Sequence, residues 1–423
     1  MEYKHLRLKL KPDKNQEELL WLHANHSRAL RNILVEYVNK VKKETPKTSI
    51  SKTLLYEKYS DLRKDTKYSW LLEVSESSLN TVTRVLYEDY NNYFKGRRRK
   101  PKFHSKKYGK QYFYPRTGKG RLYIKDSFLK IEKVGRVTIS KRDLYNKHDI
   151  IYKIQKEDKF YRSVVYHDGL DWFISLTYKN SISNDNQVKH TTVKDKQGTL
   201  GIDLGINKLA TCSDGTIYNN VIMTSYYNKL TRKLKRLQRQ VSRKYSMNKD
   251  YLVVYLLDGK GKPKLDKYGN HKFKYARKTQ NIIKLEHKIK KLQNKMKNIR
   301  KNQTHQVTKK IVDTGSQTIV IEDLNVKGMM KNKYRAYYIS NSNFFLFRKY
   351  LTYKCADRGI DLIVADSWYP SSQTCSSCGY RLEGKERQRI KNGRKTFECP
   401  KCNHTQDRDL NASINLSKYN LNR

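Results

Sequence analysis

The chain has 423 residues, of which 91 are Lys or Arg and 40 are Asp or Glu, so its formal charge is +51. A charge of this size, spread along the whole chain, requires a polyanionic partner such as nucleic acid. An anionic membrane surface is the competing partner, but the sequence has neither a run of about 18 apolar residues nor a separate basic amphipathic anchor. Because the first residues also lack the apolar core of a signal peptide, we expect a cytoplasmic protein, nucleoid-associated if the host is prokaryotic.

The first 200 residues are expected to form a small β-barrel that carries a helical insert. Residues 1–12 alternate as a strand, and a helical period follows from residue 15. The period returns to two between residues 111 and 180, where the apolar positions predict several short strands: Leu122, Ile124, Leu129, Ile131, Val137, Ile139, Ile151, Ile154, Val164, Val165, Trp172, Ile174 and Leu176. We therefore place a barrel at residues 1–14 and 104–198 and a helical domain at residues 15–103.

A basic segment ends the helical domain, with side chains at Arg97, Arg98, Arg99, Lys100 and Lys102. In so cationic a chain we expect this segment to contact phosphates, although an ordinary solvated loop has a similar composition. The Ser-, Asn- and Lys-rich residues 181–197 are expected to be a linker to the next domain.

The stretch LGIDLGIN at residues 200–207 is predicted to be a strand with one apolar face and one face that presents Asp203. A carboxylate in such a strand is costly unless it is paired or binds a metal. Gly201 and Gly205 lie on the same face, and we expect them to leave room for a metal ion and a phosphate. A strand-end Asp that caps a turn is the structural alternative.

Two later segments supply partner acids. The apolar run at residues 318–324 predicts a buried strand whose last residue is Glu322. Residues 407–416 predict a helix that Asp409 opens, with small side chains at Ala412 and Ser413 that allow close packing on a sheet. Three carboxylates from separate segments suit phosphodiester hydrolysis, because two Mg²⁺ ions stabilise the charge on the attacking and leaving oxygens. In the alternative, each acid is separately a cap or an ion-pair partner.

A helical hairpin is predicted between the first two acids, at residues 226–301. Its apolar positions follow a heptad rhythm: Leu230, Leu234, Leu237, Val241, Ile282, Leu285, Ile289, Leu292, Met296 and Ile299. The outward faces are rich in Lys and Arg, which fits either a duplex lying alongside or a solvated coiled-coil face. Turn residues at 250–273 predict a strand hairpin inserted between the two helices, and further along we expect a helix at residues 344–359 and a strand at 361–365.

Two Cys-x-x-Cys pairs, Cys375 with Cys378 and Cys399 with Cys402, are separated by 20 residues. This spacing in an intracellular chain predicts one structural Zn²⁺ held by four thiolates, with no open position for catalysis. The residue after each second thiolate, Gly379 or Asn403, suits a tight turn. We expect His404 and Cys355 to be loop or core residues rather than ligands.

Together, GIDLGINKLATCSDG, IVIEDLN and the two Cys pairs followed by DRDLNASINL resemble the three RuvC segments and the zinc insert of the TnpB family. These OrfB-like nucleases are encoded by IS-type transposons and are related to type V CRISPR effectors and Fanzor proteins. The resemblance implies a multidomain α+β fold. It comprises a RuvC/RNase H-like nuclease domain at residues 199–370 and 405–423, a zinc-ribbon insert at 371–404, and an N-terminal β-barrel (wedge) with a helical recognition insert.

The resemblance also implies the chemistry. Asp203, Glu322 and Asp409 would be the catalytic acids that hold two Mg²⁺ ions, with Asp407 as an alternative to Asp409. The protein would be an RNA-guided DNA endonuclease, acting as a monomer in a ribonucleoprotein with a transposon-derived guide RNA. It would cut double-stranded DNA beside a short target-adjacent motif. The alternatives are a compact type V CRISPR effector, a transposase that rejoins strands, and a nuclease-dead, RNA-guided repressor.

Overall fold

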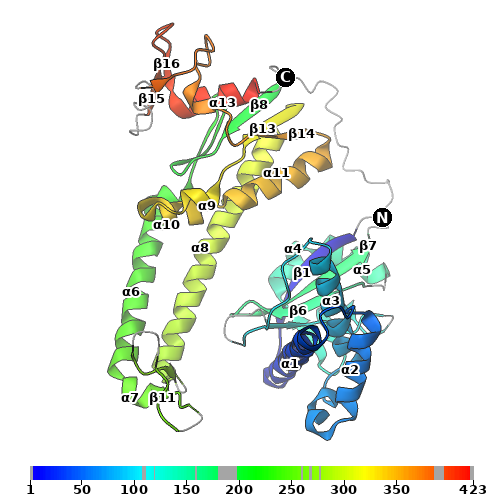
Figure 1. Ribbon diagram of the computed structural model, residues 1–423. Helices are drawn as coiled ribbons and strands as arrows, with labels where there is room; N and C mark the ends of the chain where they lie inside the picture. The colour runs from blue at the N-terminus through cyan, green and yellow to red at the C-terminus, as the bar shows by residue number, and fades with distance from the viewer. Residues whose placement is uncertain are drawn as a thin grey trace. The chain divides into compact units, whose positions relative to one another are not determined.

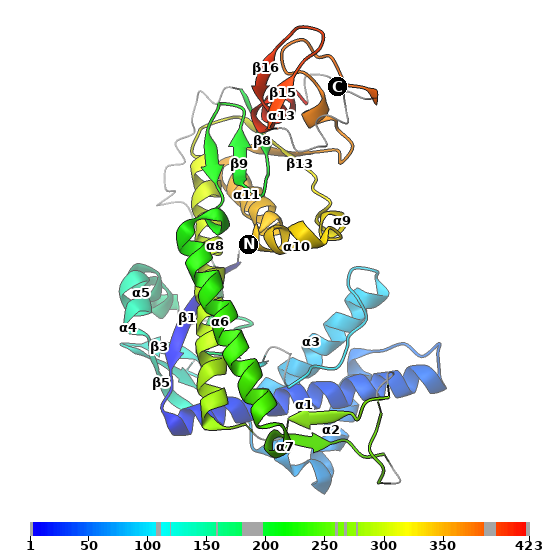
Figure 2. The same cartoon turned by 90° about the vertical axis from the view of Figure 1, so that its left-hand side faces the viewer.

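The computed structural model describes residues 3–106, 111–118, 120–157, 160–179, 198–258, 261–265, 269–275, 278–384 and 395–419. The chain divides into two compact units, Met1–Asp185 and Asn186–Arg423, which are described separately below (Figures 1 and 2). Within the described residues, every helix is too short or too polar to cross a membrane. The linker expected at residues 181–197 lies outside the described residues.

A seven-stranded antiparallel sheet forms the centre of the first unit, with the strand order β2-β6-β7-β1-β5-β4-β3. The N-terminal strand pairs with β7 along most of its length and with β5 at its end, so it belongs to this sheet. Leu8 on this strand is fully buried. The strands are β1 (Tyr3–Lys11), β2 (Gln111–Phe113), β3 (Tyr123–Lys125), β4 (Phe128–Ile131), β5 (Gly135–Ile139), β6 (Val164–His167) and β7 (Trp172–Lys179).

Two short helices, α4 (Lys141–Asn146) and α5 (His148–Glu157), replace the strand that was predicted through Ile151 and Ile154. That prediction was wrong. Both isoleucines are buried in the core of the sheet, and they lie three residues apart. Positions i and i+3 share one face of a helix but opposite faces of a strand, so the helix is what buries both side chains.

The helical insert has a core of its own. It contains α1 (Lys14–Glu44), α2 (Lys52–Lys64), η1 (Thr66–Leu72) and α3 (Glu76–Phe94), all within the helical domain predicted at residues 15–103. Helix α1 contributes Leu20 and Ala24 to the core of the sheet and Leu30 and Leu34 to the core of the helices. This one long helix therefore joins the two parts of the unit.

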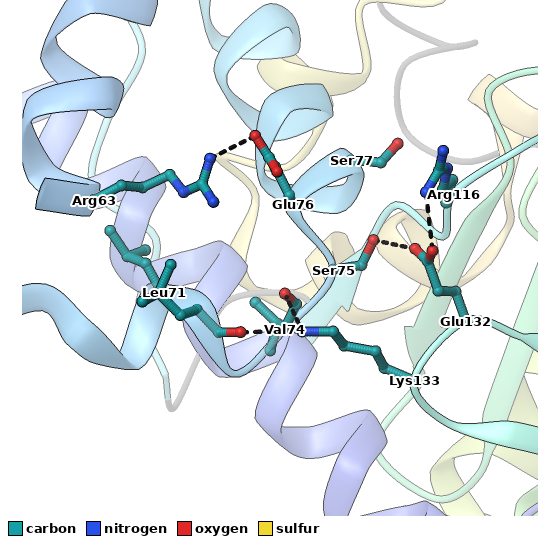
Figure 3. Close-up of a pocket in the computed structure, with 10 residues that line it drawn as sticks. Arg63, Leu71, Val74, Ser75, Glu76, Ser77, Arg116, Glu132 and Lys133 are labelled. Atoms are coloured by element: carbon teal, nitrogen blue, oxygen red, sulfur yellow. Dashed lines mark hydrogen bonds and ion pairs between the residues drawn. The ribbon is translucent and has the colours of Figure 1, made fainter.

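A cavity of about 260 Å³ lies where the helical insert meets the turn between β4 and β5 (Figure 3). The Ser75 hydroxyl donates to the Glu132 carboxylate at 2.5 Å, and Arg116 donates to the same carboxylate at 3.1 Å. Lys133 donates to two backbone carbonyls just before Ser75, at 3.0 Å each. Because these polar groups form hydrogen bonds with one another, we interpret the cavity as part of the packing between the helices and the sheet, not as a functional site.

The sheet of the second unit has five strands in the order β10-β9-β8-β13-β14. Strands β8, β13 and β14 are parallel to one another, whereas β9 and β10 run antiparallel. One face packs its apolar side chains on α8 and α11, and α13 crosses the other face over β8 (Figure 1). The strands are β8 (Thr199–Asp203), β9 (Lys208–Cys212), β10 (Ile217–Asn219), β13 (Thr318–Glu322) and β14 (Asp361–Ala365); the helices are α8 (Gln280–Val312), α11 (Phe344–Arg358) and α13 (Arg408–Ser417).

Helices α6 (Ser225–Met247) and α8 run side by side as the predicted hairpin (Figures 1 and 2). Their contact contains Leu230, Leu234 and Leu237 from α6 and Leu292 and Met296 from α8, as the heptad rhythm predicted. The inserted strand hairpin is also confirmed, as β11 and β12. The remaining elements are η2 (Val221–Met223), α7 (Lys249–Leu252), β11 (Val253–Tyr255), β12 (Phe273–Tyr275), α9 (Val326–Met329), α10 (Lys333–Asn341), η3 (Ser371–Gln373), β15 (Thr396–Glu398) and β16 (Thr405–Asp407).

Candidate functional site

Asp203 and Glu322 lie side by side at the carboxyl ends of two parallel strands. Ile202 of β8 pairs with Ile321 of β13, so the next residue on each strand faces the opposite side of the sheet, beside its neighbour. The two carboxyl groups are close enough to affect each other's pKa, and the Leu204 N–H acts to lower the pKa of Glu322. The strand register therefore brings together two acids that are more than a hundred residues apart in sequence.

Helix α13 brings the third acid to the same face. Gly201, which shares this face with Asp203, lies directly under the helix: a Cβ atom there would be 2.0 Å from the Ser413 carbonyl oxygen. Ala412 and Ser413 are buried, as predicted for close packing on a sheet. Asp409 in the first turn of α13 is near enough for its charge to raise the pKa of Asp203.

The role predicted for the two glycines was wrong. The missing side chain of Gly201 makes room for the backbone of α13, and a Cβ at Gly205 would lie 2.8 Å from the Lys208 carbonyl oxygen in the β8–β9 hairpin. Both glycines therefore allow one backbone to approach another, rather than a metal ion or a phosphate to approach Asp203.

Gly201→Ala should destabilise the protein by about 3 kcal/mol, near the upper end for an overpacked core. The helix backbone must move to accept the new methyl group, and Asp409 would move with it. Gly328→Ala is the matched control, because its Cβ would meet only the Asn325 side chain, at 3.0 Å or more. Denaturant unfolding of both variants tests this, and an unchanged stability of Gly201→Ala would contradict the packing described here.

The three acids repel one another in the metal-free protein. The pKa of Asp203 lies well above its usual value because of burial first, and then because of the charges of Glu322 and Asp409. Burial also raises the pKa of Glu322. A bound divalent cation would relieve this repulsion, and carboxylate oxygens are the ligands that Mg²⁺ prefers. Three carboxylates are a donor set of the kind that Mg²⁺ prefers, and Asp203, Glu322 and Asp409 are the residues that could hold it.

Asp407 has a different role from Asp409. Its carboxylate is the N-cap of α13, accepting the backbone N–H groups of Asp409 at 3.1 Å and Leu410 at 3.2 Å. It also accepts a hydrogen bond from Lys208 at 2.7 Å, and although partial burial acts the other way, this bond lowers the pKa of Asp407. The helix therefore begins on Asp407, not on Asp409 as predicted. Lys208 also lies 3.7 Å from the Asp409 carboxylate, a contact that the sequence pattern did not reveal.

The four predicted zinc ligands form one cluster. The Sγ atoms of Cys375, Cys378, Cys399 and Cys402 all lie within 4.8 Å of one another. The Cys375–Cys402 and Cys378–Cys399 Sγ distances are 3.7 and 3.6 Å. A tetrahedral zinc site with Zn–S bonds of about 2.3 Å has S–S edges of about 3.8 Å, so the cluster fits Zn²⁺.

The backbone turns next to the thiols also suit a zinc site. Gly379 and Asn403 have positive φ angles of 74° and 55°, as their positions predicted. The ring of His404 contacts Gln406 at 3.1 Å, and Cys355 is buried in the core of the sheet, so neither belongs to the thiol cluster.

The basic segment belongs to the first unit and the acids to the second. The side chains of Arg97, Arg98, Arg99, Lys100 and Lys102 are all exposed. Arg98 pairs with Asp89 at 2.9 Å, and Arg31 holds the backbone carbonyl of Lys102 at 2.9 Å. The segment is thus anchored at its end while its charged groups face solvent.

Comparison with known proteins identifies two family matches. Residues 344–416 match the Cas12f1-like TNB domain, and residues 177–254 match the IS605 OrfB family, described as "Probable transposase". A presumed RNA-guided DNA endonuclease of Streptomyces pristinaespiralis is 25% identical over 367 residues, covering 84% of this chain and 74% of that protein.

Two further relatives agree with these matches. InsQ of Escherichia coli K12, also named as a presumed RNA-guided DNA endonuclease, is 26% identical over 366 residues, covering 83% of this chain and 76% of its own. The CRISPR-associated endodeoxyribonuclease Cas12f2 of Micrarchaeota archaeon (strain CG1_02_47_40) is 26% identical over 269 residues, covering 60% of this chain and 41% of that protein. The chain is therefore similar to IS605 OrfB proteins over residues 177–254, and to proteins named as RNA-guided DNA endonucleases over most of its length.

Proposed function

We propose that the chain is an RNA-guided DNA endonuclease that cuts double-stranded DNA by two-metal hydrolysis at Asp203, Glu322 and Asp409. The convergence of these three carboxylates on one face of a sheet is the observation that carries the proposal. The formal charge of +51 and the names of the relatives support nucleic acid as the substrate and the partner.

We assign the second unit to the RuvC/RNase H-like class. Strand β8 lies at the centre of the five-stranded sheet. The antiparallel strands β9 and β10 lie on one side of it, and β13 and β14, which are parallel to β8, lie on the other. RNase H-like nucleases have this arrangement. In this assignment residues 371–404 are the zinc-ribbon insert. The sheet of the first unit would be the wedge-like β-barrel, residues 1–14 and 104–198, and the helices at 15–103 would recognise the guide RNA.

Each site residue has a definable task. The Leu204 N–H favours the ionised form of Glu322, the strand pairing places Asp203 beside it, and α13 presents Asp409. Bound Mg²⁺ ions would stabilise the charge that develops on the attacking and leaving oxygens. Lys208 neutralises Asp407, so the N-cap holds the start of α13 without adding to the repulsion at the acids.

The other candidate functions differ in their products or in their acids. A transposase would rejoin strands, and a CRISPR effector of the same ancestry would take its guide from a repeat array. A nuclease-dead repressor would not need the acids, and the presence of all three argues against it. The copurifying RNA and the products of the reaction therefore distinguish these candidates.

The test is to purify the protein with its native RNA, sequence that RNA, and supply matching DNA with Mg²⁺. We expect one discrete RNA species with a variable 3′ end, and cleavage of both strands of DNA that matches this end. Heterogeneous RNA without guided cleavage would contradict the proposal, and joined strands would indicate a transposase.

The basic segment should contribute to binding of the guide RNA. Replacing Arg97, Arg99 and Lys100 with Gln should weaken RNA binding and reduce the slope of log K against log salt by about 0.7 for each lost contact with a single strand. Arg98→Gln is the control with a smaller expected effect, because that guanidinium already pairs with Asp89. Filter binding over a salt series measures both quantities, and an unchanged slope in the triple variant would show that the segment is an ordinary solvated loop.

A further inference from the structure

We infer that the zinc ribbon positions Asp409, so that zinc occupancy controls how tightly the acid cluster binds its divalent cations. This inference rests on the function proposed above. The link is helix α13, which carries Asp409 in its first turn and two buried asparagines, Asn411 and Asn415, in the following turns.

Asn411 holds the backbone on both sides of the first zinc ligand. Its Nδ2 donates to the Thr374 carbonyl at 2.7 Å, and its Oδ1 accepts the Ser376 N–H at 2.8 Å. Cys375 lies between these two residues. Because an amide side chain offers both a donor and an acceptor, Asn411 fixes this stretch as a neighbouring strand would.

Asn415 and Lys418 extend the same contact along the helix. The Nδ2 of Asn415 donates to the carbonyls of Thr374 at 2.6 Å and Ser371 at 2.8 Å. The Nζ of Lys418 donates to the Ser376 carbonyl at 2.6 Å. The first Cys pair is therefore bound to α13 by side chains spread over two helical turns, a geometry that leaves the helix little freedom to slide.

The second Cys pair reaches the start of the same helix through the backbone. Cys399 and Cys402 lie between β15 and β16, and β16 ends at Asp407, the N-cap of α13. The Arg408 N–H donates to the carbonyl of Lys395, just before β15, at 2.8 Å. In sequence, Asp409 therefore lies between Arg408, which is attached to the second Cys pair, and Asn411, which is attached to the first.

Zinc is the group that would join these two attachments to each other. With the metal bound, both Cys pairs hold the first turns of α13 in one position above β8. Without it, the pairs can separate, and the start of the helix loses its support while Asp203 and Glu322 keep theirs from the sheet. Asp409 is therefore the acid whose position depends on zinc, and Asn411 is a positioning residue.

The test is a Mn²⁺ titration of the full-length protein, with and without zinc. Zinc is removed with a zinc-selective chelator, which is then removed by gel filtration. We expect the zinc-free protein to bind Mn²⁺ at the acids at least about 10-fold more weakly, because supporting groups of metal ligands typically contribute 10- to 100-fold. Asn411→Ala should give a similar loss with zinc present and should release zinc faster to a colorimetric chelator. Asn411→Asp keeps the acceptor for the Ser376 N–H, so its Mn²⁺ affinity should lie between those of the wild type and Asn411→Ala.

Two controls separate this inference from the proposed function. Asn341→Ala removes an amide whose bonds, among the described residues, stay within α10, to the Tyr337 carbonyl and Ser340, and it should leave Mn²⁺ binding unchanged. Asp203→Asn should remove the Mn²⁺ site, and if it does not, the proposed acid cluster is wrong. If Asp203→Asn removes the site but zinc-free protein binds Mn²⁺ as tightly as zinc-loaded protein, the cluster stands and the coupling is overturned.

Discussion

Asp203→Asn should abolish DNA cleavage, with a loss of at least about 100-fold, because even groups that only support a metal ligand contribute 10- to 100-fold. Binding of RNA and DNA should persist, since the cationic surface is unchanged. Single-turnover cleavage and filter binding on the same preparation measure both effects.

The same variant should raise the melting temperature of the metal-free protein at neutral pH. In the folded state the pKa of Asp203 lies above its unfolded value, so ionised Asp203 destabilises the fold. This cost is absent below the unfolded pKa and is complete once the pH has risen through the folded pKa. It amounts to about 1.4 kcal/mol for each tenfold difference between the folded and unfolded acid dissociation constants. Asn cannot ionise, so the variant escapes the cost.

Asp323→Asn is the matched control, because this neighbouring acid is exposed and pairs with Arg348 at 2.7 Å. It should leave both cleavage and stability nearly unchanged. A loss of RNA binding in Asp203→Asn, or a clear drop in its melting temperature, would mean that Asp203 is a structural residue.

Cys375→Ser should unfold the zinc ribbon and abolish cleavage together. Structural zinc contributes about 10 to 16 kcal/mol of apparent binding free energy in small zinc-dependent folds, so the loss of one thiolate removes most of what holds the ribbon. Wild-type protein should contain one zinc per chain by elemental analysis, and the variant should contain little. Calorimetry should show a lower melting temperature for the second unit.

Cys355→Ala provides the control for this experiment. That thiol is buried among Phe347 and Leu351 in the core of the sheet, so its loss should cost some stability but leave the zinc content at one per chain. Full zinc content and normal cleavage in Cys375→Ser would contradict the assignment of the thiol cluster.

Local patterns predicted most of the elements, the four thiols that cluster and the three acids that lie on one face of the sheet. Alternation at residues 200–206 identified the face that carries Asp203, and the spacing of the Cys pairs identified the thiol cluster. The heptad rhythm identified the hairpin of α6 and α8. Each of these signals depends on residues that lie close together in sequence, so each could be read without knowing the fold.

The features that the sequence did not reveal depend on contacts between distant residues. A side chain at position 201 would clash with the backbone carbonyl of Ser413, so this position needs glycine. Asn411 forms a hydrogen bond with Ser376, 35 residues earlier. The sequence does not distinguish Lys208 from the many other lysines of this chain; only the structure shows its contacts with Asp407 and Asp409. Helix α10 was missed because its sequence, with three Tyr among nine residues, has only one buried apolar residue, Ile339, to mark an inner face.

The most direct test of the account is the anomalous diffraction of Mn²⁺ in crystals of the protein bound to guide RNA and target DNA. We expect two Mn²⁺ peaks about 3.5 to 4 Å apart, bonded to carboxylate oxygens of Asp203, Glu322 and Asp409. Peaks bonded to other residues, with these three carboxylates left without metal while DNA occupies the site, would contradict it.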